Sequence, residues 1–428
     1  MEKKVKCPQL LPRLALRPHN IPRKSLTPPC IVQPVPRNMN KKTRLQYTAN
    51  MKRSRKFLIF FRMGILLMLS AVSLPVFSFP FSGRSAPPST AASAAIAEAT
   101  PLRTAPRDET VEHLFTHCLI AHPEIAFAKG NEYGKHLDAD CLTPLEFRRI
   151  LNLLYEDGYA LTDPVKTFRR EGNYARRVSF PFPADKKPLI LSFDDVVYAS
   201  KNAGKGMADK LIVTESGEIA AYTHNALPHI HQEEFVPILE EFISRHPDFS
   251  YEHARGVIFL TGFDGILGYR TQRDSPDRET ERKKAQKVVD ALKAKGWKFG
   301  CHSYAHGHMN KYTEEKMRSD IEKWKNEVQP LVGETPLYAY PYGEWTLGKN
   351  CSDDRQQALI NAGFLLFCGV GESPFYAPMP LGESSVKVLF QDRCAMDGIS
   401  LRNHHFDRFF DAREVYDPVR PVAFPSSR

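Results

Sequence analysis

The feature that most constrains the fold is a repeated alternation of short apolar segments with amphipathic ones between residues 111 and 390. Buried strands are predicted at residues 111–120, 188–193, 256–261, 297–301, 336–340, 364–368 and 386–390. Helices are predicted at residues 143–157, 232–244, 279–294, 313–329 and 353–361. Strands that alternate with helices pair in parallel and carry the helices on the outside. About seven such units favour a distorted (β/α)7-type barrel over an open sheet.

The helix predicted at residues 143–157 shows the local signals most clearly. Thr143 precedes it as an N-cap, Pro144 stands in the first turn and Gly158 follows the last residue. These are the residue types that favour the start and the end of a helix.

Charge is distributed unevenly along the chain. Residues 1–57 carry 15 Lys or Arg against one acidic residue, Glu2, so their net charge of +14 exceeds the +10 of the whole chain. The remainder has a net charge of −4. A mildly acidic folded part lacks the basic surface that a phosphate backbone needs, and nucleic acid is therefore not an expected partner.

The basic segment is followed by a run of apolar residues within positions 58–81 that is long enough to span a bilayer. Positive charge before this run and little after it predict a cytoplasmic N-terminus and an outer remainder. We therefore expect a basic cytoplasmic segment at residues 1–57, a membrane anchor or signal peptide at 58–81, a flexible linker at 82–107 and one folded domain at 108–428. The expected location is extracytoplasmic and membrane-anchored. Secretion is the alternative, because small residues near position 95 would allow signal cleavage.

Two adjacent carboxylates, Asp194 and Asp195, follow the strand predicted at 188–193. Residues at the carboxyl ends of barrel strands are where catalytic groups lie. Neighbouring carboxylates repel each other unless a cation or separate partners divide their roles. Taken alone, the pair is better explained as a turn or a helix cap.

Two histidines, His302 and His306, follow the strand predicted at 297–301. If the chain turns helically there, the i, i+4 spacing places both imidazoles on one face, where they can bind one metal ion together with a carboxylate. His308 is a further candidate, and a solvated or capping role is the alternative for each.

A third motif, LYAYPYGEW, begins at residue 337. Pro341 and Gly343 predict a turn that would let the amide of Tyr342 face a ligand, and the rings of Tyr340, Tyr342 and Trp345 would pack against sugars. The alternative is a core turn with aromatic packing.

In this order and after successive strands, the three motifs closely resemble those of the polysaccharide deacetylases of carbohydrate esterase family 4, the NodB-homology domains. The resemblance covers about residues 111–402. His117 occupies the place of the Tyr-His found on the first strand of the subgroup related to poly-N-acetylglucosamine deacetylases.

The resemblance implies a barrel of the NodB kind and roles for the motif residues. Asp195, His302 and His306 would bind a divalent metal ion, with Zn²⁺ the first choice. Asp194 would be the general base toward metal-bound water, and the amide of Tyr342 would help the metal to hold the oxyanion.

Two departures from the family pattern stand out. Many members have an arginine where this chain has Ala339, so another donor is needed to orient Asp194. The late Leu-x-His motif that supplies a general acid is missing, and His117, His404 and His405 are the candidate substitutes. Substrate contacts are predicted for Tyr340, Pro341, Trp345 and Arg270, and also considered for Asp264, although ordinary loop roles explain Arg270 and Asp264 equally well.

The predicted function is removal of acetyl groups from N-acetylated sugars of a cell-envelope or extracellular polysaccharide. An O-acetyl esterase that uses the same site is chemically close. A deacetylase-like barrel that binds glycan with little turnover is a second alternative. A two-carboxylate glycosidase is a third, but it leaves His302 and His306 unexplained.

Overall fold

The computed structural model describes residues 100–425 except 172–173, 225–227, 345–352, 372–375 and 381–386. The segments predicted at residues 1–57 and 58–81 lie outside the described residues, as does most of the linker predicted at 82–107. Across the described ranges, none of the helices combines the length and apolar character needed to cross a bilayer.

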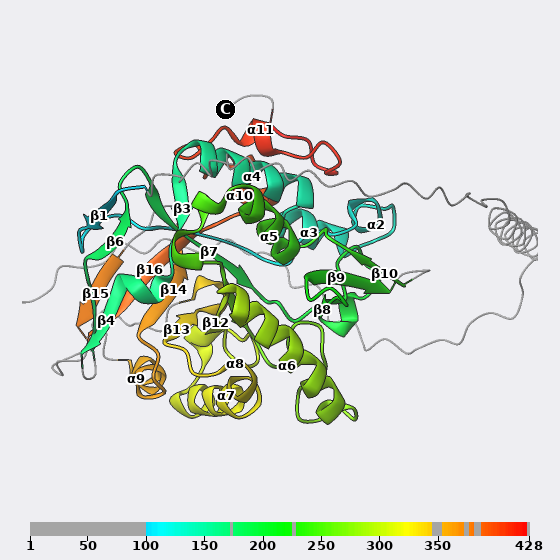
Figure 1. The fold of residues 1–428 in the computed structure, drawn as a ribbon. Helices are drawn as coiled ribbons and strands as arrows, with labels where there is room; N and C mark the ends of the chain where they lie inside the picture. The colour runs from blue at the N-terminus through cyan, green and yellow to red at the C-terminus, as the bar shows by residue number, and fades with distance from the viewer. Residues whose placement is uncertain are drawn as a thin grey trace, which may run out of the picture. The chain divides into compact units, whose positions relative to one another are not determined.

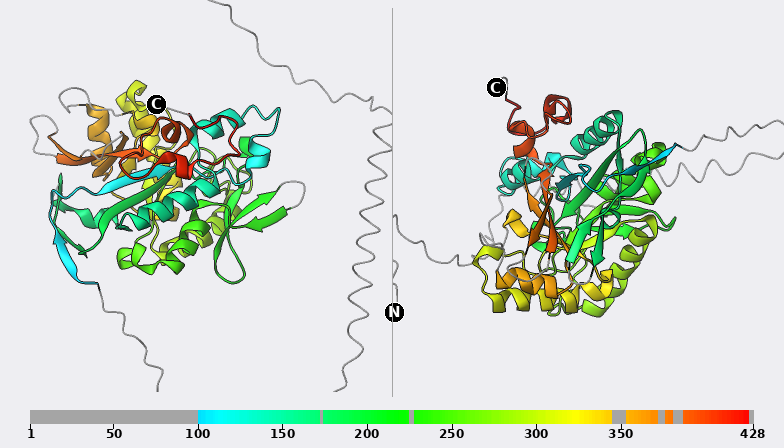
Figure 2. Two further views of the ribbon diagram at one scale, coloured as in Figure 1. Left: turned by 90° about the horizontal axis from the view of Figure 1, so that it is seen from above. Right: turned by 90° about the vertical axis from the view of Figure 1, so that its left-hand side faces the viewer.

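Seven parallel strands form a closed ring (Figures 1 and 2). In ring order they are β2 (Glu112–Thr116), β7 (Lys187–Asp194), β11 (Val257–Leu260), β12 (Lys298–Cys301), β13 (Leu337–Ala339), β14 (Leu366–Val370) and β16 (Lys387–Ala395). Each strand pairs in parallel with the next, and β16 pairs with β2 to close the ring. The predicted (β/α)7-type barrel is confirmed.

The ring is distorted around β7, which contacts more than two strands. Near its start, Leu189 pairs with Leu161 of β3 (Tyr159–Leu161), which lies outside the ring. Near its end, Ser192 pairs with Val257 of β11. The neighbour of β7 therefore changes from β3 to β11 along its length, which brings its last residues between β2 and β11.

The predicted helices cover the outside of the barrel (Figure 1). They are α4 (Pro144–Glu156), α5 (Phe235–Arg245), α6 (Arg278–Lys295), α7 (Glu314–Glu327) and α9 (Asp354–Asn361). At the start of α4, the Thr143 side chain accepts a hydrogen bond from the Glu146 amide and the Glu146 side chain accepts one from the Thr143 amide. This reciprocal cap satisfies amides that the first turn leaves without partners.

Several smaller elements surround the barrel. The helices are α2 (Pro123–Ala126), α3 (Gly134–Asp140), α8 (Gln329–Val332), α10 (Gly398–Arg402) and α11 (Ala412–Val415). The strands β8 (Lys210–Val213), β9 (Ile219–His224) and β10 (Pro228–His231) form an antiparallel sheet between β7 and α5. Antiparallel pairs also join β1 (Leu102–Ala105) to β6 (Phe180–Pro183), β4 (Phe168–Glu171) to β5 (Tyr174–Arg177), and β15 (Tyr376–Pro380) to β16.

The C-terminal part of the described chain lies over α3 and α4 and is tied to them by Arg420. This buried guanidinium donates to both carboxylate oxygens of Glu146, at 2.6 and 2.7 Å, and to the carboxylate of Asp138 at 3.0 Å. The segment that follows the last barrel strand thus shares one buried ionic group with the segment between β2 and β7.

Candidate active site

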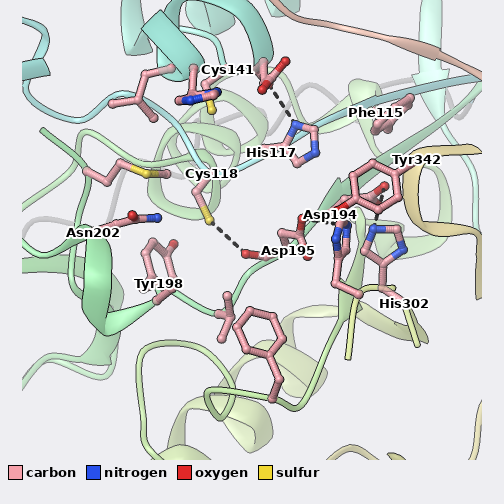
Figure 3. A pocket seen from close by; sticks show the side chains of 18 of the residues that line it. Phe115, His117, Cys118, Cys141, Asp194, Asp195, Tyr198, Asn202, His302 and Tyr342 are labelled. Carbon is pink, nitrogen blue, oxygen red and sulfur yellow. Dashed lines mark hydrogen bonds and ion pairs between the residues drawn. The ribbon is translucent and has the colours of Figure 1, made fainter. Parts of the chain in front are cut away.

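Asp194 and Asp195 lie at the carboxyl end of β7 and line one pocket (Figure 3). Asp194 is the last residue of the strand and is 2% exposed. Asp195 follows with a φ of 56°. Aspartate is among the few side-chain types that tolerate this left-handed conformation, and the turn directs consecutive carboxylates toward the same pocket.

Arg393 of β16 holds the Asp194 carboxylate with two parallel hydrogen bonds, both of 2.8 Å. Both side chains are almost wholly buried. The guanidinium also lies over the Phe115 ring, 4.1 Å from its centre. Arg393 is therefore the donor that the sequence required in place of an arginine at position 339, but it comes from a different strand.

The charge of Asp194 follows from these contacts. Burial alone would raise the pKa of its carboxyl group, but the charge of Arg393, followed by that of His302, outweighs burial and holds the pKa well below its ordinary value. Asp194 is therefore ionised throughout the neutral range.

His302 directly follows β12, and its Nδ1 lies 2.9 Å from the backbone oxygen of Ala339. A carbonyl oxygen can only accept, so Nδ1 carries the proton and Nε2 keeps its lone pair for the pocket. His306 Nε2 lies 3.1 Å from Oδ2 of Asp195. One ligand atom from each of Asp195, His302 and His306 lies within 4.8 Å of the other two.

The backbone brings the two histidines together in a different way from the one predicted. Residues 302–308 do not form a helical turn. Instead Ser303 and His306 have φ values of 56° and 49°, and two left-handed residues fold the segment back on itself. The i, i+4 helix argument was wrong, although both side chains reach the same pocket.

The three side chains fit a divalent metal ion. Oδ1 of Asp195 is buried and has no hydrogen-bond partner in the described part of the chain. A buried carboxylate oxygen without a donor is costly, and a bound cation would satisfy it. Burial, followed by the charge of His117, lowers the pKa of His306 to about 4, so this imidazole is neutral and able to bind a metal at neutral pH.

His117 enters the same pocket from the end of β2 (Figure 3). Its Nδ1 donates to the backbone oxygen of Asp140 at 2.8 Å. Burial would lower the pKa of His117, but the charges of Asp195 and Asp194 outweigh burial and raise it. Of the three histidines considered as proton donors, His404 and His405 do not line this pocket.

The turn predicted after β13 is present as a short 3-10 helix, Pro341–Gly343. Tyr342 has a φ of 58° and its side chain is 59% exposed. Its ring lies edge-on to His306, with 4.6 Å between ring centres, and stacks on His308 at 4.5 Å. Tyr342 thus forms one wall of the pocket beside His302 and His306.

Two of the predicted sugar contacts, Tyr340 and Pro341, are largely buried, although Tyr340 is among the residues that line the pocket. The ring of Tyr340 is fully buried against Phe367 and Phe390, because the strand directs it into the barrel core. Pro341 is also buried and shapes the turn. Trp345 lies outside the described residues.

Arg270, for which a contact with substrate was predicted, makes internal contacts with the loop that follows Asp195. Its guanidinium pairs with Asp264 Oδ2 at 2.7 Å and donates to the backbone oxygen of Tyr198 at 2.6 Å. Asp264 in turn accepts from the Ser200 amide at 2.7 Å. The two residues fix the loop that follows Asp195, which is the ordinary loop role considered as the alternative.

The pocket has a volume of about 560 Å³ and extends beyond the catalytic groups. Its far side is formed by residues that sequence reasoning did not single out: Tyr133, His136, Leu137, Lys201, Asn202 and Met207. This volume is within the range of pockets that bind small molecules, and it leaves room for a sugar next to Asp194.

A family model described as polysaccharide deacetylase matches residues 266–359. The match contains His302, His306 and the Pro341–Gly343 turn, and the barrel places Asp194 and Asp195 beside them. The matched segment of the chain is similar to polysaccharide deacetylases. These are hydrolases that act on carbon–nitrogen bonds other than peptide bonds.

Several solved structures are similar to this one. The Streptococcus pyogenes deacetylase PplD, in complex with acetate, is 13% identical, with 70% of this chain and 97% of that chain covered and a TM-score of 0.39. A Bacillus cereus polysaccharide deacetylase is 12% identical, with coverages of 74% and 70% and a TM-score of 0.36. IcaB from Ammonifex degensii is 13% identical, with coverages of 68% and 94% and a TM-score of 0.34. No curated protein matches the sequence.

Proposed function

We propose that this chain is a metal-dependent polysaccharide deacetylase that removes acetyl groups from N-acetylated sugars of a cell-envelope or extracellular polysaccharide. The observation that carries the proposal is the ionised Asp194, held by Arg393 beside the ligand set of Asp195, His302 and His306. Because Asp194 is not one of the three proposed metal ligands, its carboxylate is available as a base.

The proposed metal is Zn²⁺, which two imidazoles and one carboxylate suit, and which would polarise an amide carbonyl and lower the pKa of water when bound. Asp194 accepts the proton of the attacking water. Its low pKa limits its strength as a base, but it ensures that the carboxylate is ionised when substrate arrives.

The other groups of the pocket complete the reaction. His117 can donate a proton through Nε2 to the departing amine, because its Nδ1 is engaged by Asp140 and the neighbouring carboxylates favour its charged form. The Tyr342 amide, on the exposed turn, is the proposed donor to the developing oxyanion. Acetate and a free amino sugar are the products.

The test is acetate release from N-acetylglucosamine oligomers and from peptidoglycan, using the full chain after removal of metal and again after addition of Zn²⁺. Release that depends on Zn²⁺ is the expected result. No release from either glycan by folded, metal-loaded protein would contradict the proposal. An O-acetylated glycan assayed in parallel separates the esterase alternative, because the same groups would hydrolyse an ester.

We further propose that the domain acts outside the cytoplasm and is anchored by residues 58–81. The support is the apolar run that follows the basic segment. Fractionation of cells that express the full chain should recover it with membranes, and external protease should reach the domain. Recovery in the cytoplasmic fraction would contradict this location, and recovery in the medium would favour secretion.

A further inference from the structure

Three histidines that the catalytic pocket does not use gather at one side of the small β8–β10 sheet. They are His122, which follows β2 and precedes α2, and His229 and His231 of β10. None of the three lines the pocket of Asp194. The cluster is therefore separate from the proposed catalytic metal ligands.

The strand geometry explains how the cluster forms. Residues two apart on a strand point to the same face, so His229 and His231 lie on one face of β10 and Ile230 on the other. Ile230 is 56% exposed. On the neighbouring strand β9, Thr223 pairs with His229 in the antiparallel register.

His122 reaches this face because its backbone amide donates to the Gly206 carbonyl oxygen at 2.8 Å. Helix α2 consequently lies next to β9 and β10 (Figure 1). The approach is close, since a Cβ at Gly206 would lie 2.6 Å from the Cβ of Ala126 in α2. The contact fixes the third imidazole over the strand pair.

The three imidazoles converge on one point. The ring of His122 lies 5.1 Å from that of His229 and 5.0 Å from that of His231, and the last two rings are 5.0 Å apart. One ring nitrogen from each residue lies within 4.8 Å of the other two. Three imidazoles directed at one point form a set of nitrogen ligands that can hold a transition-metal ion.

Two neighbouring side chains add to the set. The Thr223 hydroxyl lies 3.2 Å from Nε2 of His122 and 2.8 Å from Nε2 of His231, so both nitrogens face the same small space. Oε1 of Glu124 lies 3.6 Å from Nδ1 of His122. A carboxylate on the far nitrogen of a histidine favours a proton there and leaves Nε2 free to bind a metal.

We propose that His122, His229 and His231 form a second metal site for a Zn²⁺-class divalent ion, with Glu124 orienting His122. Nδ1 of His231 now accepts a long hydrogen bond of 3.2 Å from the Glu233 amide. If Nε2 binds the metal ion, the proton of the ring moves to Nδ1 and this hydrogen bond is lost. The metal–nitrogen bond replaces that contact and the link to Thr223.

The site would act as a clip between two segments that are distant in sequence. It would join the β2–α2 connection to β10, and the loop that contains Gly206 continues into Met207 and Ala208 of the catalytic pocket. A metal ion at the cluster would therefore stabilise one wall of the pocket without taking part in the reaction.

The test uses the full chain with His302→Ala and His306→Ala, which removes the proposed catalytic ligands and leaves the cluster intact. After treatment with a chelator, this protein is titrated with Zn²⁺ by calorimetry and with Co²⁺ by visible absorption. One equivalent of either ion should bind, and bound Co²⁺ should give the absorption of a site with nitrogen ligands.

Adding His229→Gln, at an exposed position, should weaken binding about 100-fold, and Glu124→Gln should weaken it about 10-fold. His224→Gln, in the same sheet but outside the cluster, is the matched control and should bind normally. Melting temperatures of the metal-free variants should agree, which separates lost ligands from lost structure.

The proposal is overturned if the protein without His302 and His306 binds no equivalent of Zn²⁺ or Co²⁺, or if His224→Gln weakens binding as much as His229→Gln. A different result is expected if the proposed catalytic site binds no metal and the His122 cluster does. The unsubstituted chain would then bind one equivalent of Zn²⁺ rather than two, and His229→Gln would remove that equivalent.

Discussion

Two buried arginine–carboxylate pairs, Arg420–Glu146 and Arg393–Asp194, lie in different regions of the molecule. They differ in how many hydrogen bonds the carboxylate accepts from the protein. Glu146 accepts from Arg420 through both oxygens and also from the amides of Thr143 and Asp417. A carboxylate has about four acceptor positions, so Glu146 has none left. Asp194 accepts two hydrogen bonds from Arg393, and its remaining positions face the pocket.

The comparison separates a structural ion pair from a functional one. Both arginine side chains are 0% exposed, and in both cases the pairing offsets the cost of burying a charge. Only the pair at the end of β7 keeps an ionised oxygen for a ligand. We therefore expect both pairs to matter for folding and only Asp194–Arg393 to matter for the chemical step.

The largest expected effect is that of Asp194→Asn on acetate release. Loss of the general base should lower kcat by about 10³-fold, while Zn²⁺ still binds through Asp195, His302 and His306. The substitution also leaves the buried Arg393 without its counter-ion, so the free energy of unfolding should fall by about 3 kcal/mol. Activity is to be measured well below the melting temperature of the variant, with metal content determined on the same sample.

Arg420→Met tests the other half of the comparison. Removing one partner leaves the buried carboxylates of Glu146 and Asp138 unpaired, and the free energy of unfolding should fall by about 3–5 kcal/mol. The kcat of the folded protein should stay within about 2-fold of the original. A loss of kcat as large as that of Asp194→Asn, in fully folded protein, would show that the two pairs are not separable.

His117→Gln tests whether His117 is the proton donor that works together with the Asp194–Arg393 pair. Loss of a proton donor should lower kcat by about 10²-fold with little change in unfolding. A proton donor works below its pKa, and the pKa of His117 is raised above its ordinary value. Activity of the unsubstituted chain should therefore persist through neutral pH and decline as pH rises through that pKa. If the activity of His117→Gln still declines over the same alkaline pH range, the decline belongs to the titration of another group.

Tyr342→Ala should have the smallest effect of the four. The proposed oxyanion donor is a backbone amide, which the substitution keeps, whereas the exposed ring lies against the rings of His306 and His308 and would contact the substrate. KM should rise a few-fold with kcat nearly unchanged, as expected for loss of uniform binding. Initial rates over a range of chitooligosaccharide concentrations would separate the two constants.

Much of the barrel followed from the sequence because its strands are short apolar runs separated by well-marked helices. The strands predicted at residues 188–193 and 297–301 were placed to within one residue at each end, and the fold brings the residues at their carboxyl ends to one end of the barrel. Periodicity does not reveal left-handed turns, so the helical geometry expected for His302 and His306 was wrong.

Arg393 and the β8–β10 sheet were missed for different physical reasons. The strand predicted at 386–390 continues to Ala395, and a charged residue within it is tolerated only because Asp194 lies across the ring. That pairing depends on ring closure through β2, which no local pattern specifies. The β8–β10 strands are short and partly exposed, so their apolar pattern is weak.

The most direct test of the central claim is the pH profile of acetate release for the full chain with Arg393→Met, compared with Arg420→Met. A base works above its pKa, and Arg393 holds the pKa of Asp194 low, so its removal should leave burial dominant and raise that pKa. The acid limb of the profile should then move to higher pH in Arg393→Met and stay in place in Arg420→Met. An unmoved acid limb in folded, metal-loaded Arg393→Met would contradict the role assigned to the Asp194–Arg393 pair.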